Sequence, residues 1–185
     1  GGIMNNLLII VDYQYDFVAD DGLLTAGKKA QDIENNIYDL ANEYIKNNSD
    51  IIFTLDTHIK EEWHIHPESK SFNLHCEKGT KGHNPYGKLE KVLSYKNCKI
   101  LEKKGYAPTI KDIENIVNNY DNIELCGVVT DICVLQTAIT IYNACANMGK
   151  TINFKVNSNA CTSFNENGHT FALDYMKNIL GFKII

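Results

Sequence analysis

Runs of consecutive apolar residues alternate along the chain with longer stretches in which apolar residues recur every three or four positions. The first pattern is typical of strands buried on both faces, and the second of helices that cover a sheet. Predicted strands are 6–12, 50–56, 99–103, 123–128, 151–156 and 182–185, and predicted helices are 28–48, 110–119, 133–148 and 165–180. In the last helix we expect Phe171, Tyr175 and Leu180 to face inward. The alternation predicts an α/β protein, a three-layer sandwich with a six-stranded, mostly parallel sheet.

Composition narrows the class of protein. The chain has 185 residues and a net charge of −5, which suits one domain over 1–185 and favours neither a nucleic-acid nor a membrane partner. It contains no long apolar segment and no signal-peptide pattern, and residues 1–3, which precede Met4, resemble a cloning remnant. Because no secretory signal is present, we expect its six cysteines to be reduced thiols in a cytoplasmic protein. The absence of a Cys-x-x-Cys pair argues against a zinc ribbon or a thioredoxin motif.

Reactive side chains stand where the predicted strands end. Asp12, Asp56 and Lys103 close the first three strands, and Cys133 follows the fourth strand after a short turn. The carboxyl ends of parallel strands lie at one edge of a sheet, which is where ligands bind in such folds. We therefore expect these four residues to share a site.

The chemistry of this group centres on Cys133. If Thr130 or Asp131 caps the helix that follows, the thiol lies at the positive end of the helix dipole, which favours the thiolate. Asp12 could accept the thiol proton and lysine could stabilise the thiolate, with the backbone N–H groups of Val129 and Cys133 as an oxyanion hole. Lys104 is as good a candidate as Lys103 on charge alone, and a lone cysteine at such a position is often only a small buried side chain.

A second cluster points to a metal. Residues 57–88 form a long loop rich in histidine, and loops of this length in compact domains are usually functional. Asp56 and His58 begin it, His75 follows later, and the third ligand could be His64, His66 or Glu68; these donors suit zinc, manganese or iron better than calcium or magnesium. The alternative is a solvated, histidine-rich loop.

Four motifs give the chain a family resemblance: IIVDYQYDF (9–17), LDTH (55–58) with a later His-Cys, EKKGY (102–106) and GVVTDICVLQTA (127–138). Together they resemble the isochorismatase-like cysteine hydrolases, and among these the nicotinamidases. The resemblance covers nearly the whole chain and implies the strand order 3-2-1-4-5-6.

The resemblance also implies roles for individual residues. The implied catalytic residues are Asp12 as acid and base, Lys103 with Lys104 as the alternate, and Cys133 as nucleophile. The implied metal ligands are Asp56, His58, Glu68 and His75, with His64 and His66 as alternates to Glu68. An aromatic substrate would lie among Phe17, Phe72, Tyr106 and Val128, and the Val128–Val129 peptide would be cis.

The implied activity is hydrolysis of nicotinamide to nicotinate and ammonia through a thioester on Cys133, with one divalent metal, zinc ahead of manganese or iron. The chain contains no arginine. Because arginine is the usual partner of a substrate carboxylate, this absence favours a neutral amide over N-carbamoyl or ureido compounds. Pyrazinamide as a further substrate, and a non-catalytic metal-binding or redox-sensing protein, are the remaining alternatives. An exposed sheet edge and a short final strand favour a homo-oligomer.

Overall fold

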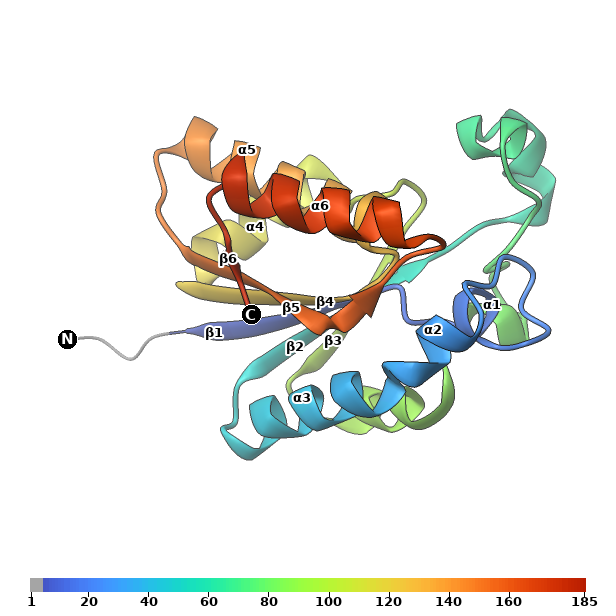
Figure 1. The fold of residues 1–185 in the computed structure, drawn as a ribbon, viewed down its shortest axis with the longest axis horizontal. Coiled ribbons are helices and arrows are strands. Elements are labelled where there is room, and N and C mark those ends of the chain that lie inside the picture. The colour runs from blue at the N-terminus through green and yellow to red at the C-terminus, as the bar shows by residue number, and fades with distance from the viewer. Residues whose placement is uncertain (1–4) are drawn as a thin grey trace.

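The computed structural model describes residues 5–185, so the suspected cloning remnant at 1–3 lies outside the described part of the chain. One six-stranded sheet with the order β3-β2-β1-β4-β5-β6 forms its centre (Figure 1), and every strand pair is parallel. The strands are β1 (Asn6–Val11), β2 (Asp50–Asp56), β3 (Cys98–Lys103), β4 (Asn122–Val128), β5 (Asn153–Thr162) and β6 (Lys183–Ile184). The predicted class and strand order are confirmed.

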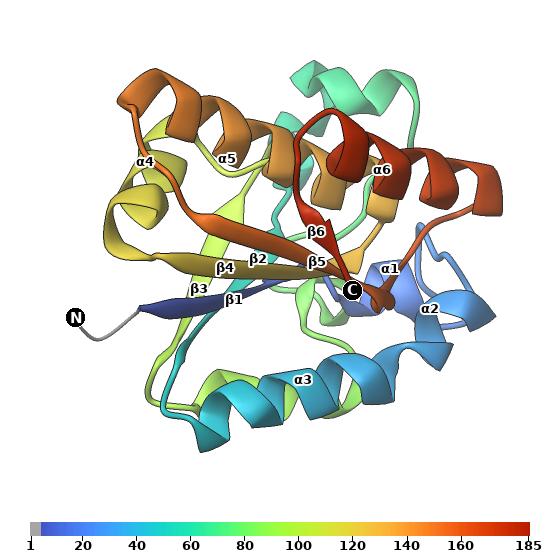
Figure 2. The ribbon, with the colours of Figure 1, turned by 60° about the vertical axis from the view of Figure 1, so that its left-hand side comes forward.

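Helices cover both faces of the sheet (Figures 1 and 2). The α-helices are α1 (Tyr15–Val18), α2 (Lys28–Asp32), α3 (Glu34–Lys46), α4 (Ile110–Asn119), α5 (Leu135–Met148) and α6 (Glu166–Asn178). Short 3-10 helices are η1 (Lys60–Ile65), η2 (Pro67–Lys70), η3 (Lys81–His83) and η4 (Gly87–Ser94), and Thr130–Val134 forms a π-helical turn. None of the described helices is long and apolar enough to cross a membrane.

Two apolar layers hold the sandwich together. One face of the sheet packs against α4, α5 and α6, and the other against α1, α2, α3 and η4. Within β1, alternate side chains enter opposite layers, so that Leu7 and Ile9 face the first group of helices while Leu8 and Ile10 face the second. This two-sided burial explains why the strands read as continuous apolar runs rather than as alternating patterns.

Several predicted boundaries are wrong for local reasons. The expected helix 28–48 breaks at Ile33, whose backbone (φ −91°, ψ 0°) departs from helical values between α2 and α3. Strand β5 continues well beyond the expected end at Val156. Phe171 is 60% exposed on the outer face of α6, and only Leu180 of the three expected inward residues is fully buried. Aromatic residues at helical spacing misled the prediction, because the residues that α6 buries are Ala172 and Met176.

The strand order places a switch point beside β1. The chain runs outward from β1 through β2 to β3, then crosses to β4 on the other side of β1. Ligands in open α/β sheets bind at such a point, beyond the carboxyl ends of the strands. Val11, the last residue of β1, is in register with Thr54 on β2 and with Gly127 on β4. Asp12, the next residue, therefore lies at the carboxyl edge of the sheet, between the half formed by β2 and β3 and the half formed by β4, β5 and β6.

Candidate active site

Three of the predicted residues meet at this edge. The Nζ atom of Lys103 lies 2.7 Å from Oδ2 of Asp12 and 3.8 Å from Sγ of Cys133. It also donates a hydrogen bond of 3.0 Å to the carbonyl of Gly105. All three side chains are buried, so the ammonium bridges a carboxylate and a thiol away from bulk water. Lys104, the alternate, is exposed and pairs with Glu62, so Lys103 and not Lys104 lies in this cluster.

Asp12 is held in an unusual backbone conformation. Its φ is +51°, in the left-handed region that costs a non-glycine residue free energy and is found most often at functional sites. Thr54 on β2 supports it: the backbone N–H of Asp12 donates to Oγ1 of Thr54, and that hydroxyl donates to Oδ1 of Asp12 at 2.7 Å. Oδ2 is left to face Lys103. Thr54 was not among the predicted residues, because only the register of β1 against β2 could have indicated it.

Cys133 lies in the π-helical turn between β4 and α5, and not at the start of the α-helix as expected. The predicted cap is also wrong, since neither Thr130 nor Asp131 caps the turn. Instead, Oγ1 of Thr130 is 2.7 Å from Nδ1 of His169, and Asp131 accepts a short hydrogen bond from Ser163. These partners lie more than thirty residues away, so local sequence gave no sign of them.

Two backbone features fix the approach to this turn. The Val128–Val129 peptide is cis, as expected. Gly127 has a φ of +119°, and a Cβ there would lie 2.1 Å from the carbonyl oxygen of Val11. Glycine is therefore required where β4 passes β1, and the chain reaches Val129 at a fixed position beside Asp12.

Burial and charge oppose each other in this cluster. Burial raises the pKa of Cys133, and the ammonium of Lys103 lowers it without cancelling the effect of burial. The predicted preference for thiolate in the free protein is therefore wrong in direction. Burial also raises the pKa of Asp12, again opposed by Lys103. The pKa of Lys103 is lowered by burial but raised overall by the facing charge of Asp12. A carboxylate with a raised pKa beside a neutral thiol is suited to take its proton.

The predicted metal ligands form a second cluster next to the first. One ligand atom from each of Asp56, His58, Glu68 and His75 lies within 4.8 Å of the others, and all four residues are buried. Nε2 of His58 is 2.9 Å from Oδ2 of Asp56 and 3.5 Å from Oε1 of Glu68. Oδ1 of Asp56 lies 3.8 Å from Nζ of Lys103, so the two clusters adjoin.

The donor set fits a divalent cation. Nδ1 of His75 lies 2.7 Å from the carbonyl oxygen of Asn73 and donates to it, so that in the neutral ring, the form that binds a metal, the lone pair is on Nε2. Among the described buried side-chain atoms, Nε2 is the one without a hydrogen-bond partner, although carboxylate oxygens of Asp56 and Glu68 lie 3.2 and 3.4 Å away. Burial lowers the pKa of His75, but these carboxylates raise it overall to about 10. The centre of the cluster thus favours a positive charge, and two imidazoles with two carboxylates suit zinc, manganese or iron.

The alternates to Glu68 lie outside the cluster. His64 is exposed, and His66 packs beside His58 with both ring nitrogens in hydrogen bonds. The geometry therefore groups Glu68, and neither of these histidines, with the three other donors.

A small pocket opens over Cys133 and reaches the metal cluster. The expected residues Phe17, Phe72, Tyr106 and Val128 all line it, together with Val129, Asp56 and Glu68. Three further lining residues were missed, namely Leu24, Ile132 and Phe164. They come from a loop, from the π-helical turn and from the segment before α6, and no sequence pattern marked them. Aromatic and aliphatic walls with a few polar groups at one end are typical of sites for small, flat ligands.

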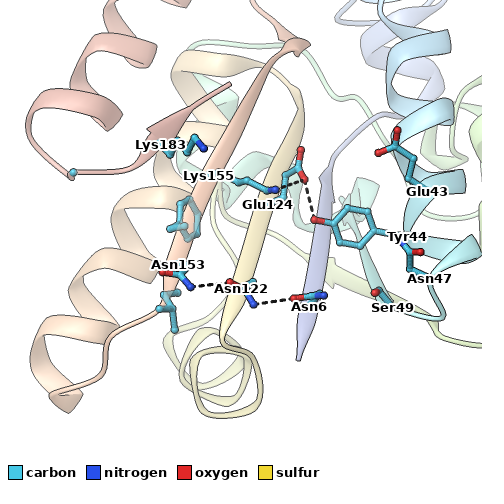
Figure 3. Close-up of a pocket in the computed structure, with 13 residues that line it drawn as sticks. Asn6, Glu43, Tyr44, Asn47, Ser49, Asn122, Glu124, Asn153, Lys155 and Lys183 are labelled. Carbon is cyan, nitrogen blue, oxygen red and sulfur yellow. Dashed lines mark hydrogen bonds and ion pairs between the residues drawn. The ribbon is translucent and has the colours of Figure 1, made fainter. Parts of the chain in front are cut away.

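A larger groove, about 780 Å³ in volume, lies at the opposite edge of the sheet (Figure 3). Its centre is the buried carboxylate of Glu124, which accepts a hydrogen bond of 2.8 Å from the Tyr44 hydroxyl and one of 3.2 Å from the Asn157 amide. Lys155 lies 3.6 Å away. Amide side chains bridge the amino ends of β1, β4 and β5 through the residues Asn6, Asn122 and Asn153. Glu124 is satisfied within the protein and no cysteine is among the described residues that line the groove, so the smaller pocket is the better candidate for a reactive site.

Comparison with known proteins agrees with this geometry. The isochorismatase domain profile matches residues 6–183. The chain is 36% identical over 188 residues to an uncharacterized isochorismatase family protein, PncA, of Bacillus subtilis, covering 98% of this chain and 99% of the relative. This chain therefore belongs to the isochorismatase family.

Two crystal structures are close in fold and sequence. The nicotinamidase/pyrazinamidase PncA of Bacillus subtilis superposes with a TM-score of 0.87 at 34% identity, covering 98% of this chain and 99% of that one. The pyrazinamidase/nicotinamidase of Streptococcus mutans superposes with a TM-score of 0.87 at 39% identity, covering 98% and 100%.

Proposed function

We propose that this protein is a metal-dependent cysteine amidohydrolase that converts nicotinamide to nicotinate and ammonia. One observation carries the proposal: the buried group of Asp12, Lys103 and Cys133 adjoins a four-ligand cation site across a small aromatic pocket. The names of the two related structures, which mention nicotinamidase and pyrazinamidase activity, support the same class of substrate.

The roles of the chain's own groups follow from their positions. Asp12 accepts the thiol proton of Cys133 as the sulfur attacks the carboxamide carbon, and Lys103 stabilises the charge on both partners. The backbone N–H groups of Val129 and Cys133 donate to the developing oxyanion. Asp12 then returns the proton to the departing nitrogen, releasing ammonia and leaving a thioester. Attack of water on the thioester carbon, again with Asp12 as base, frees nicotinate and restores the thiol.

Substrate orientation comes from the other side of the pocket. Asp56, His58, Glu68 and His75 would hold the metal, which when bound supplies a Lewis acid for the ring nitrogen of the substrate. Phe17, Phe72 and Tyr106 would enclose the ring and exclude water. Fixing the reacting atoms in this way contributes several kcal/mol, on the order of 7 or more in ideal cases.

The pocket also bears on specificity. Its charged lining residues are the carboxylates Asp56 and Glu68, and the nearby Lys103 is already paired with Asp12. The described lining residues include no unpaired lysine or arginine side chain that could bind a substrate carboxylate, so a neutral heteroaromatic amide fits best. Pyrazinamide, which has this character, is the second substrate we propose.

Ammonia release from nicotinamide tests the proposal. Purified, reduced protein is assayed before chelation, after chelation, and after zinc, manganese or iron is restored. We expect turnover to vanish on chelation and to return with at least one metal. Folded protein that releases no ammonia from nicotinamide or pyrazinamide under any of these metals would contradict the proposed function.

A further inference from the structure

His66 lies against the proposed metal site without belonging to it. Its Nδ1 atom accepts a hydrogen bond of 3.1 Å from the backbone N–H of Glu68. Because Nδ1 accepts, Nε2 of the neutral ring carries the proton and donates to the carbonyl oxygen of Lys104 at 2.8 Å. Both nitrogens are occupied, so this ring has no lone pair left for a metal.

The first hydrogen bond acts on the position of Glu68. His66 is the N-cap of η2. Its ring accepts a hydrogen bond from a backbone N–H of the first turn, a group that has no partner within the helix. Glu68 is the second residue of that turn, so the contact fixes the backbone from which its carboxylate reaches His58 and His75. A 3-10 helix of four residues has little stability of its own, which makes the cap important for this ligand.

The ring itself packs against a second ligand. The centroids of His66 and His58 are 4.8 Å apart with their planes nearly perpendicular, and the indole of Trp63 stacks on His66 at 5.1 Å. Trp63 also meets the His58 ring edge to face at 4.8 Å. These contacts restrict the orientation of the His58 imidazole.

The second hydrogen bond reaches the strand that carries the lysine. Lys104 directly follows Lys103 at the end of β3, and Nζ of Lys103 donates to the carbonyl of Gly105 in the same turn. Through these two hydrogen bonds, the His66 ring connects the loop that bears Glu68 to the turn after β3, beside the group of Asp12, Lys103 and Cys133.

We propose that His66 is a positioning residue that sets Glu68 for metal binding and joins the metal-binding loop to the end of β3. The inference rests on the metal site of the proposed function, but not on the identity of the substrate. Positioning groups around a metal typically contribute 10- to 100-fold in affinity.

The test measures metal binding directly in purified, chelator-treated protein. Zinc dissociation constants are obtained by competition with a chelator for the wild type, His66→Ala, His66→Asn and the control His64→Ala, which alters an exposed histidine of the same loop. Cobalt absorption spectra at saturation then report the ligand set. Asparagine retains the acceptor that caps η2 but lacks the ring and the reach to Lys104.

We expect His66→Ala to weaken zinc binding about 10- to 100-fold, with His66→Asn in between, His64→Ala unchanged, and the cobalt spectrum preserved in all. Wild-type affinity in His66→Ala would overturn the inference. So would a cobalt spectrum of His66→Ala that shows the loss of a nitrogen ligand, since His66 would then itself be a ligand.

Should His66→Ala fail to fold, His66→Asn decides: weaker binding with a preserved spectrum supports the inference, and wild-type affinity overturns it. None of these measurements uses an amide. If the variants change zinc affinity as expected but the protein releases no ammonia, the proposed function is wrong while the role of His66 still stands.

Discussion

Cys133 is surrounded by groups that act on its proton in opposite directions. Its identity as the candidate nucleophile could be predicted from the sequence, because it follows a buried strand and a polar turn. The direction of its pKa could not, because burial by residues distant in sequence outweighs Lys103. In the mechanism that we propose, Asp12, whose pKa is also raised by burial, takes the thiol proton as the sulfur attacks.

The proposed nucleophile is tested by Cys133→Ala. We expect ammonia release to fall by at least about 10³-fold, since loss of a nucleophile removes the covalent route, while the metal content stays at the wild-type level. Steady-state kinetics and elemental analysis measure the two quantities. Cys145→Ala, a half-buried thiol on α5, is the control. Turnover that survives in Cys133→Ala would exclude the thioester route.

Glu68 could not be chosen over His64 and His66 by spacing, because all three lie in one short stretch of loop. The fold separates them: Glu68 is buried with the other donors while His64 is exposed. We expect Glu68→Ala to lower metal occupancy at stoichiometric zinc and His64→Ala to leave it unchanged, as measured by elemental analysis after gel filtration. Full occupancy in Glu68→Ala would show that the ligand is misassigned.

At the level of elements, strands and helices were predicted well where one spacing of apolar residues continues along the whole element. The prediction failed where tertiary contacts decide the backbone. The π-helical turn at Thr130–Val134 depends on Ser163, which directly follows β5 and bonds to Asp131, and on His169 of α6, which lies against Thr130. Its position next to the proposed nucleophile is consistent with the frequent occurrence of π-turns at functional sites.

Helix α6 is expected to influence the rate through this turn. A Cβ on Gly168 would lie 2.1 Å from Oδ2 of Asp131, so Gly168→Ala must displace either the carboxylate or the start of the helix. We expect a loss of about 1–3 kcal/mol in the free energy of unfolding and a lower kcat. Urea denaturation and turnover assays measure these effects.

Asn167→Ala, at an exposed neighbouring position of the same helical turn, provides the control for Gly168→Ala. A Gly168→Ala protein with wild-type stability and kcat would show that Asp131 can move without consequence for Cys133.

For the whole molecule, the strand order follows from the family resemblance and the class from hydrophobic patterning, and the structure confirms both. The position of the site also follows, because residues at the ends of parallel strands must converge. What the sequence could not provide is the pocket wall: Leu24, Ile132 and Phe164 come from separate segments that only the folded chain brings together.

Metal binding should stabilise the whole fold. The proposed ligands join the end of β2 to the loop before β3, and an ion that binds only the folded chain adds RT ln(1 + [L]/Kd), about 2.7 kcal/mol at 100 times Kd. For a domain of this size we expect chelation to lower the Tm by roughly 5–10 °C. Calorimetry with and without chelator measures the shift.

The Glu68→Ala variant should show a smaller difference in Tm between the two conditions. A Tm that is insensitive to chelation in metal-loaded wild-type protein would contradict a structural contribution of the ion.

Lys103 lies on β3, an edge strand of the sheet, which pairs with β2 alone and has mostly exposed or half-buried side chains. Strands of this kind open locally at a lower free energy than the centre of a sheet. The proposed catalytic group therefore depends on the least protected strand of its half of the fold. We expect mild denaturant to abolish turnover at concentrations at which the amides of β1 and β4 are still protected from hydrogen exchange. Inactivation would then occur before global unfolding.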